Sequence, residues 1–259
     1  KGEITGIYGS YRDVTDRKKA EEALLNSKEK LKAILTSSPV ALSVFDLEGN
    51  VVELNEAALR LHGFSKEEET FRQEVRAFLK EVATPEVVAE ADSGQGWGPH
   101  TWKFVQALGS RRLLTPTWPK EYGGLGLPPI YRFIMHEEID FTGALKPEAL
   151  MVGANIAGPT IMQVGSDKQK KEFLPRIARG EIEFAIGYTE PQAGSDLASL
   201  QMRAEDKGDH FLFNGQKVFN TRCHFAQYHW IVARTDPAAP KHRGISLFIV
   251  DMKTPGITV

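Results

Sequence analysis

Residues 187–199 read GYTEPQAGSDLAS and are the most informative stretch of the chain. Small and hydroxyl-bearing residues interrupt a junction between a region of helical periodicity and a region of strand periodicity. Thr189 and Ser195 supply hydroxyl groups, and Gly194 lacks a side chain, so backbone amides there can approach an anion. Asp196 is expected to cap the turn that follows. The residues by themselves support a ligand-facing loop and an ordinary tight loop equally.

The residues before this loop predict a run of helices. An amphipathic helix begins near Glu69, with apolar residues three or four positions apart, and is expected to end at Pro85. A glycine-containing loop at 94–99 and a glycine-rich connection at 118–126 follow. Further helices are expected at 101–108, 130–141, 144–153, 159–164 and 168–179.

After the loop the hydrophobic period changes to that of strands. We expect strands from Phe184 onward and at 202–205, 211–213, 230–234 and 245–250, with turns at 206–209 and 214–215. Helices first and strands second indicate an α+β chain with two packed units, and not alternating βαβ units. The second of these is expected to be an antiparallel, barrel-like β domain.

The first 68 residues have a different character. A strand at 4–11 precedes a long helix that reaches Ser37, with Thr15 as its expected N-cap. This helix has an apolar seam surrounded by lysines and glutamates. A strand at 41–45, a turn at 48–50 and a strand at 51–54 predict a hairpin, and Asn55 is expected to cap the next helix.

Bulk composition excludes several classes of function. The chain has 259 residues, 41% of them hydrophobic, and a net charge of −2, so it lacks the basic character of a nucleic-acid-binding protein. No stretch approaches the roughly 20 apolar residues of a membrane span. The single cysteine, Cys223, cannot form an internal disulfide, which favours a reducing compartment and a cytoplasmic location. The absence of a starting methionine suggests that the segment comes from a larger protein.

Several residues that could suggest chemistry have simpler structural interpretations. Trp230 lies in a strand pattern and is expected in the core. His224 and His229 have no cysteine or carboxylate at metal-ligand spacing, so we predict no metal site. The acidic cluster formed by Glu137, Glu138 and Asp140 is expected to be a solvated helix face, and Glu190 is expected to be structural.

The chain from Glu69 to Val259 resembles the acyl-CoA dehydrogenases. Their signature matches the loop at 187–199, and further motifs stand at the family spacing. These are WPxxYGG at 118–124, GSDxQK at 165–170, LPxIxxG at 174–180, NGQK at 214–217 and KHRGIS at 241–246. Several independent motifs in one order are far more specific than a single glycine loop.

The resemblance implies an oxidised FAD between the helical and β domains, with the acyl thioester against its isoalloxazine ring. Carried over by position, Tyr188 and Thr189 would contact the flavin ring, while Gly194 and Ser195 would approach the FAD pyrophosphate. Thr221 would bond near flavin N5. Phe219 takes the place of the usual tryptophan, keeping an aromatic face but losing an indole N–H. The segment Arg222-Cys223-His224 departs from the small residues usual there.

The resemblance also implies the reaction, namely α,β-desaturation of an acyl-CoA thioester with electrons passed to an electron-transfer flavoprotein. The catalytic base of the family is a glutamate that would lie beyond Val259, so no catalytic residue is assigned and this chain alone is expected to be inactive. A homo- or hetero-oligomer is expected for the full-length form. Residues 187–189 and 234–237 resemble bacterial members, some of which act on acyl groups as large as steroid side chains.

The first part of the chain resembles PAS sensor modules. We therefore expect four parts: the closing strand and linker helix of one PAS module at 1–37, a partial second module at 38–68, the dehydrogenase helical domain at 69–183 and its incomplete β domain at 184–259. Two alternatives to an enzyme stay open. The protein could be a PAS-type signalling protein, or the two halves could be joined by a fusion or assembly artefact with no shared function.

Overall fold

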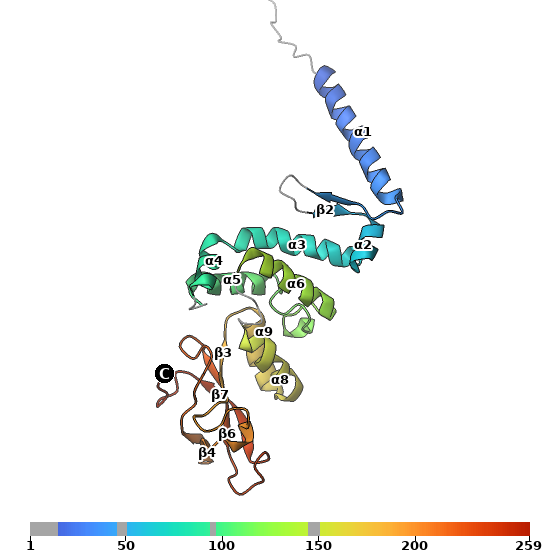
Figure 1. Ribbon diagram of the computed structural model, residues 1–259. Helices are drawn as coiled ribbons and strands as arrows, with labels where there is room; N and C mark the ends of the chain where they lie inside the picture. The colour runs from blue at the N-terminus through green and yellow to red at the C-terminus, as the bar shows by residue number, and fades with distance from the viewer. Residues whose placement is uncertain (1–14, 46–50, 94–96, 145–150) are drawn as a thin grey trace, which may run out of the picture. The chain divides into compact units, whose positions relative to one another are not determined.

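The computed structural model describes residues 15–45, 51–93, 97–144 and 151–259. The chain divides into two compact units, Lys1–Thr70 and Phe71–Val259, which are described separately (Figure 1). The strand expected at 4–11 and the turn expected at 48–50 lie outside the described residues.

The first unit contains a long helix and a short hairpin. Helix α1 (Thr15–Ser37) begins at Thr15, which is therefore its first residue and not its expected N-cap. Strands β1 (Ser43–Phe45) and β2 (Val51–Leu54) pair antiparallel, with a register shift after Val44. They confirm the predicted hairpin strands.

Side-chain hydrogen bonds cap the N-termini of two helices that begin in this unit. The Asn55 side chain accepts a hydrogen bond from Ala58 N at 2.9 Å, so it caps helix α2 (Glu56–His62) as expected. Ser65 and Glu68 form a reciprocal pair, in which Ser65 Oγ accepts from Glu68 N and Glu68 Oε2 accepts from Ser65 N. This capping box starts helix α3 (Lys66–Val82), which continues into the second unit.

The second unit begins with helices. They are the remainder of α3, α4 (Pro85–Asp92), α5 (Pro99–Ser110), η1 (Lys120–Tyr122), α6 (Pro129–Thr142), the π-helix η2 (Gly153–Ala157), α8 (Gly158–Val164) and α9 (Asp167–Ala178). Pro85 starts α4 and does not directly end α3, because proline fits the first helical turn, where its missing N–H is not needed. Part of the helix expected at 144–153 lies outside the described residues.

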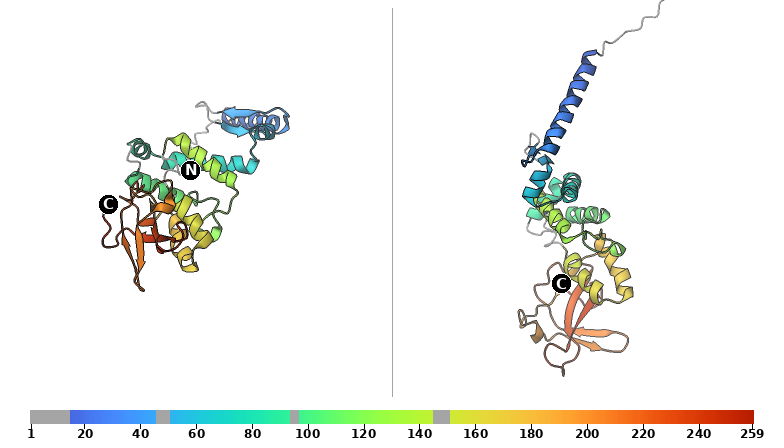
Figure 2. Two further views of the ribbon diagram at one scale, coloured as in Figure 1. Left: turned by 60° about the horizontal axis from the view of Figure 1, so that its bottom comes forward. Right: turned by 90° about the vertical axis from the view of Figure 1, so that its right-hand side faces the viewer.

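One apolar core extends from these helices into the sheet. Phe104 and Leu108 of α5, Ile139 of α6 and Ile177 of α9 are almost completely buried, as is Phe184 at the start of the sheet. Trp230 joins the same core and is 2% exposed, as expected. The helices and strands of the second unit keep to separate regions in both views of Figure 2. Burial on this scale fixes the position of the loops that leave the sheet.

The sheet differs from the antiparallel, barrel-like domain that we expected. Its strands are β3 (Phe184–Gly187), β4 (Arg203–Asp206), β5 (Phe211–Asn214), β6 (Tyr228–Arg234) and β7 (Ile245–Asp251). The β3–β6 pair is parallel, from Phe184 opposite Tyr228 to Gly187 opposite Ile231, whereas β6–β7 and β4–β5 are antiparallel. In the described part of the chain the sheet is therefore mixed and forms no closed barrel. The hydrophobic period reveals strands but not their direction.

Candidate functional site

The backbone of residues 188 and 189 lies against residues 217 and 218. The Thr189 carbonyl accepts a hydrogen bond from Val218 N at 2.9 Å, and the Tyr188 carbonyl accepts one from Lys217 Nζ at 3.2 Å. The Tyr188 hydroxyl accepts a hydrogen bond from Trp230 Nε1 at 3.0 Å. Two stretches that are almost 30 residues apart, and that the sequence singled out separately, thus meet at the end of β3.

Buried Glu190 holds this junction together. Its carboxylate accepts hydrogen bonds from Gln201 N at 2.6 Å, Met202 N at 3.0 Å and Lys217 Nζ at 2.8 Å, and it is only 3% exposed. Burial alone would raise the pKa of Glu190, but these donors outweigh it and hold the pKa below its usual value. The structural role expected for Glu190 is confirmed. Its ion-pair partner, Lys217, could not be predicted from the sequence.

The part of the loop around Gly194 and Ser195 faces solvent. Glu190 and Ala193 exchange two backbone hydrogen bonds, which closes a tight turn. Gly194 and Ser195 follow and are exposed, and a side chain added at Gly194 would meet no protein atom within 4 Å. Asp196 does not cap the following turn with its side chain, contrary to expectation, because the carboxylate pairs with Lys241 at the surface. The loop therefore presents open backbone and a free hydroxyl.

Phe219 and Thr221 project from a strained turn. Phe219 has a φ of 54° and its ring is 88% exposed, so it is not a core residue. Thr221 N donates to the Phe219 carbonyl at 2.9 Å, and Thr221 is exposed beside it. A bulky aromatic residue with positive φ and an exposed ring is uncommon, and such strain is concentrated at functional sites.

Arg222 turns inward, toward a buried carboxyl group. Its guanidinium lies over the Trp97 ring at 5.1 Å, and its Nη1 lies 4.0 Å from Glu183 Oε1. Burial raises the pKa of Glu183 to about 7, although Gly153 N donates to this carboxyl group at 3.0 Å and the charge of Arg222 opposes the shift. Trp97 Nε1, Glu183 Oε2 and Arg222 Nη1 are buried without a hydrogen-bond partner among the described residues. Nothing in the sequence pattern connects these residues.

His229 on β6 lies beneath the same turn. Its Nε2 is 3.2 Å from Asn220 Oδ1, and the side chain is largely buried. Burial, together with the charge of Lys217, lowers the pKa of His229 to about 4, so the ring is neutral at pH 7. The other candidate histidine, His224, is exposed. In the described ranges, no three metal-binding side chains come together.

The acidic cluster on α6 is only in part the solvated face that we expected, because Asp140 is exposed but Glu138 is buried. Glu138 is 2% exposed and accepts hydrogen bonds from Arg76 Nε at 2.7 Å and Arg72 Nη1 at 2.8 Å. Arg72 also pairs with Glu137. These ion pairs join α3 to α6, and they hold the pKa of Glu138 below its usual value despite its burial. Its carboxylate is a structural group.

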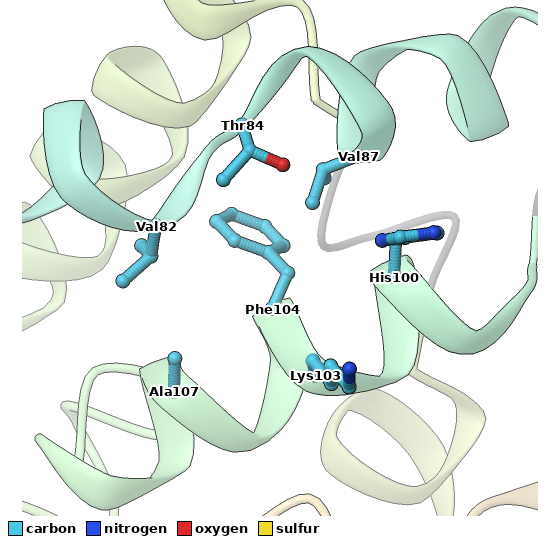
Figure 3. Close-up of a pocket in the computed structure, with 7 residues that line it drawn as sticks. All are labelled: Val82, Thr84, Val87, His100, Lys103, Phe104 and Ala107. Atoms are coloured by element: carbon cyan, nitrogen blue, oxygen red, sulfur yellow. The ribbon is translucent and has the colours of Figure 1, made fainter.

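A small apolar cavity lies apart from these residues, between the end of α3, α4 and α5. Its volume is about 220 Å³, and Figure 3 shows the Phe104 ring among Val82, Thr84 and Val87, with His100 and Lys103 on α5. None of the residues named above in the two loops lines it.

Among the described helices, none is long and apolar enough to cross a membrane.

Two family models match the second unit in order. The model of the acyl-CoA dehydrogenase N-terminal domain matches residues 65–181, and that of the middle domain matches 185–259. A PAS domain model matches residues 29–93 and so overlaps the first of these.

Relatives and solved structures agree with the first two models. Acyl-CoA dehydrogenase FadE29 of Mycobacterium tuberculosis is 43% identical over 190 residues, which cover 73% of this chain and 48% of the relative. The structure titled "Tcur3481-Tcur3483 steroid ACAD" is 40% identical, with a TM-score of 0.66, over 74% of this chain and 49% of its own. The structure of the ChsE4-ChsE5 complex from Mycobacterium tuberculosis is 39% identical, with a TM-score of 0.65. The match covers 73% of this chain and 48% of the chain in that structure. The chain spans about half the length of these relatives, over the residues that carry its N-terminal and middle domains, and it belongs to the acyl-CoA dehydrogenase family.

Proposed function

We propose that this chain supplies the flavin-binding part of a dehydrogenase that desaturates an acyl-CoA thioester between its α and β carbons. The observation that supports the proposal is the contact of residues 188–189 with Lys217 and Val218, because exposed Phe219 and Thr221 follow these two residues directly in the chain. Electrons would then leave through an electron-transfer flavoprotein.

The residues present fit an FAD molecule. An exposed aromatic ring at Phe219 offers an apolar face to a flavin ring, and Thr221 offers a hydroxyl beside it. The open space at Gly194 and the exposed hydroxyl of Ser195 suit the approach of a pyrophosphate to backbone amides. When bound, FAD supplies the acceptor for the hydride that leaves the β carbon. The protein residues named here bind and orient it.

The same reaction needs a carboxylate that removes the α proton. The buried carboxylates Glu138 and Glu190 are held by arginine and lysine partners, so neither is available as a base. We propose, as the family resemblance implies, that the base is supplied from outside residues 1–259 and that the chain alone binds FAD without turnover. The likeness to a structure titled as a steroid dehydrogenase favours a bulky acyl group, and the likeness to a two-protein complex favours a hetero-oligomer.

A sensor role for the first unit is a second candidate, supported by the PAS model match at 29–93. It predicts that a small ligand or haem binds within the first unit. A cytoplasmic location fits either candidate, because Cys223 is the only cysteine of the chain.

Equilibrium titration of the purified chain with FAD tests the proposal. We expect saturable binding of one FAD per chain, and roughly three- to tenfold weaker binding in Thr221→Val and Ser195→Ala, because each loses one hydrogen bond. Thr258→Ala removes an exposed hydroxyl near the C-terminal end and serves as the control. A folded chain that shows no saturable FAD binding would overturn the proposal.

A further inference from the structure

The turn that carries Phe219 and Thr221 is conformationally costly. Phe219 and Arg222 both have positive φ, at 54° and 72°. Non-glycine residues in this region cost on the order of 1–3 kcal/mol each and persist only where surrounding contacts fix them. The backbone bond from Thr221 N to the Phe219 carbonyl belongs to the turn itself, so it cannot fix the turn relative to the sheet.

Asn220, between the two exposed residues, provides one such fixed contact. Its Oδ1 faces His229 Nε2 at 3.2 Å. With the Asn220 amide oxygen facing the ring, the tautomer that bears its proton on Nε2 donates this hydrogen bond. His229 belongs to β6, which pairs with β3 on one edge and with β7 on the other. The imidazole therefore links the turn to the middle of the sheet.

Gly187 shows that the position of this ring is tightly constrained. A Cβ built on Gly187 would lie 2.8 Å from His229 Cε1 and closer still to its Nε2. The His229 ring thus occupies the space where a side chain at 187 would be. Because Gly187 is the last residue of β3, directly before Tyr188, the ring packs beside both segments of the candidate flavin site.

We propose that His229 is a positioning residue, which holds Asn220 and thereby sets the orientation of Phe219 and Thr221 toward the flavin. This inference rests on the proposed function for the identity of the ligand, but the restraint on the turn is a property of the chain itself. Glycine is required at 187 because only glycine leaves room for the imidazole.

Four variants separate this role from general packing. His229→Phe keeps a ring but removes the donor, and Asn220→Ala removes the acceptor. His229→Gln restores a donor, because its amide nitrogen lies about as far from the backbone as Nε2 does. His210→Phe makes the same change at an exposed histidine outside the measured segment and is the matched control.

The experiment measures hydrogen–deuterium exchange of residues 217–226 in the chain without FAD, followed by FAD titration of each variant. We expect His229→Phe and Asn220→Ala each to speed exchange in the turn and to weaken FAD binding roughly three- to tenfold. The double variant should be no worse than the worse single variant, since one bond is lost in each case. His229→Gln should recover most of the binding, and His210→Phe should match the unsubstituted chain.

The outcomes distinguish the positioning role of His229 from the proposed function in FAD binding. Unchanged exchange of the turn in both His229→Phe and Asn220→Ala would overturn the positioning role, even if FAD binds. Faster exchange of the turn in these variants, in a chain that never binds FAD, would support the role of His229 in holding the turn. It would overturn the proposed function. Because Asn220 is only half-buried, its alanine variant keeps the test decisive if His229→Phe fails to fold.

Discussion

The two units differ in how much of their apolar surface they bury. On α1 in the first unit, Leu24, Leu31 and Ile34 are 57%, 49% and 58% exposed, whereas the second unit buries a continuous core that joins helices to sheet. A buried polar group needs such surroundings to be held in one orientation. The buried contacts of Glu190, Lys217 and His229 lie beside this core in the second unit, whereas Asn55 of the first unit is held by hydrogen bonds to its own hairpin and helix.

The largest expected effect is on the core of the second unit. Phe184→Ala removes a completely buried ring that packs near Phe173, Tyr228 and Trp230, and should lower the free energy of unfolding by about 3–5 kcal/mol. All four tryptophans of the chain lie in this unit, so denaturant unfolding followed by tryptophan fluorescence reports on it directly. A loss below about 1 kcal/mol would show that this core is not packed as described.

The second-largest loss of stability is expected when the buried ion pair between Lys217 and Glu190 is broken. Lys217→Met leaves the Glu190 carboxylate buried with its backbone donors but without its positive partner, and should cost about 3 kcal/mol. Lys241→Met breaks the exposed pair with Asp196 in the same region and should cost less than about 1 kcal/mol. Similar losses in the two variants, measured by the same unfolding assay, would contradict the burial of Glu190.

The pH dependence of stability tests Glu183. Its pKa rises from 4.5 in the unfolded chain to about 7 in the folded one, so its contribution is fully present below about pH 4.5 and is lost as the pH rises to about 7. Glu183→Gln does not titrate. The free energy of unfolding of this variant, relative to the original chain, should therefore rise by roughly 2 kcal/mol between these pH values.

His229 should make the free energy of unfolding depend on pH in the opposite direction to Glu183. Its pKa falls from 6.5 to about 4 on folding, so its contribution is present above about pH 6.5 and is lost as the pH falls toward 4. This decline at low pH should persist in Glu183→Gln. A difference between the two chains that stays flat from pH 4.5 to 7 would mean that Glu183 is ionised in the folded protein.

The smallest effect should be in the first unit. Leu24→Ala and Leu31→Ala shorten exposed side chains of α1 and should change stability by no more than about 0.5 kcal/mol. Circular dichroism is the appropriate probe, because this unit contains no tryptophan. A large loss from either variant would show that this helix face is covered in solution and would reduce the contrast between the units.

Most of the fold could be predicted from local sequence patterns. Periodicity gave the helices α5, α6, α8 and α9 and the strands β4 to β7 to within a few residues, and the cap at Asn55 followed from its side chain. Helix α4 was missed because Pro85 can end one helix or start another. The parallel pairing of β3 with β6 was missed because side-chain alternation is the same for both strand directions.

Only those site residues that belong to the family motifs could be predicted from the sequence. These motifs selected residues 188–195 and 217–221, and the structure joins Tyr188, Thr189 and Glu190 to Lys217 and Val218. The burial of Glu138 depends on arginines more than 60 residues away, and the contacts of Glu183 with Arg222 and of His229 with Asn220 depend on how the sheet and the turn pack. No local pattern encodes such pairs, because each residue alone has an ordinary surface or core interpretation.

Hydrogen–deuterium exchange of the whole chain with and without saturating FAD shows whether the two loops of the second unit bind the flavin. We predict slower exchange on FAD addition in residues 187–199 and 217–226, with no change in α1, β1, β2 or α2. Protection confined to the first unit, or no protection at either loop under conditions where FAD binds, would contradict it.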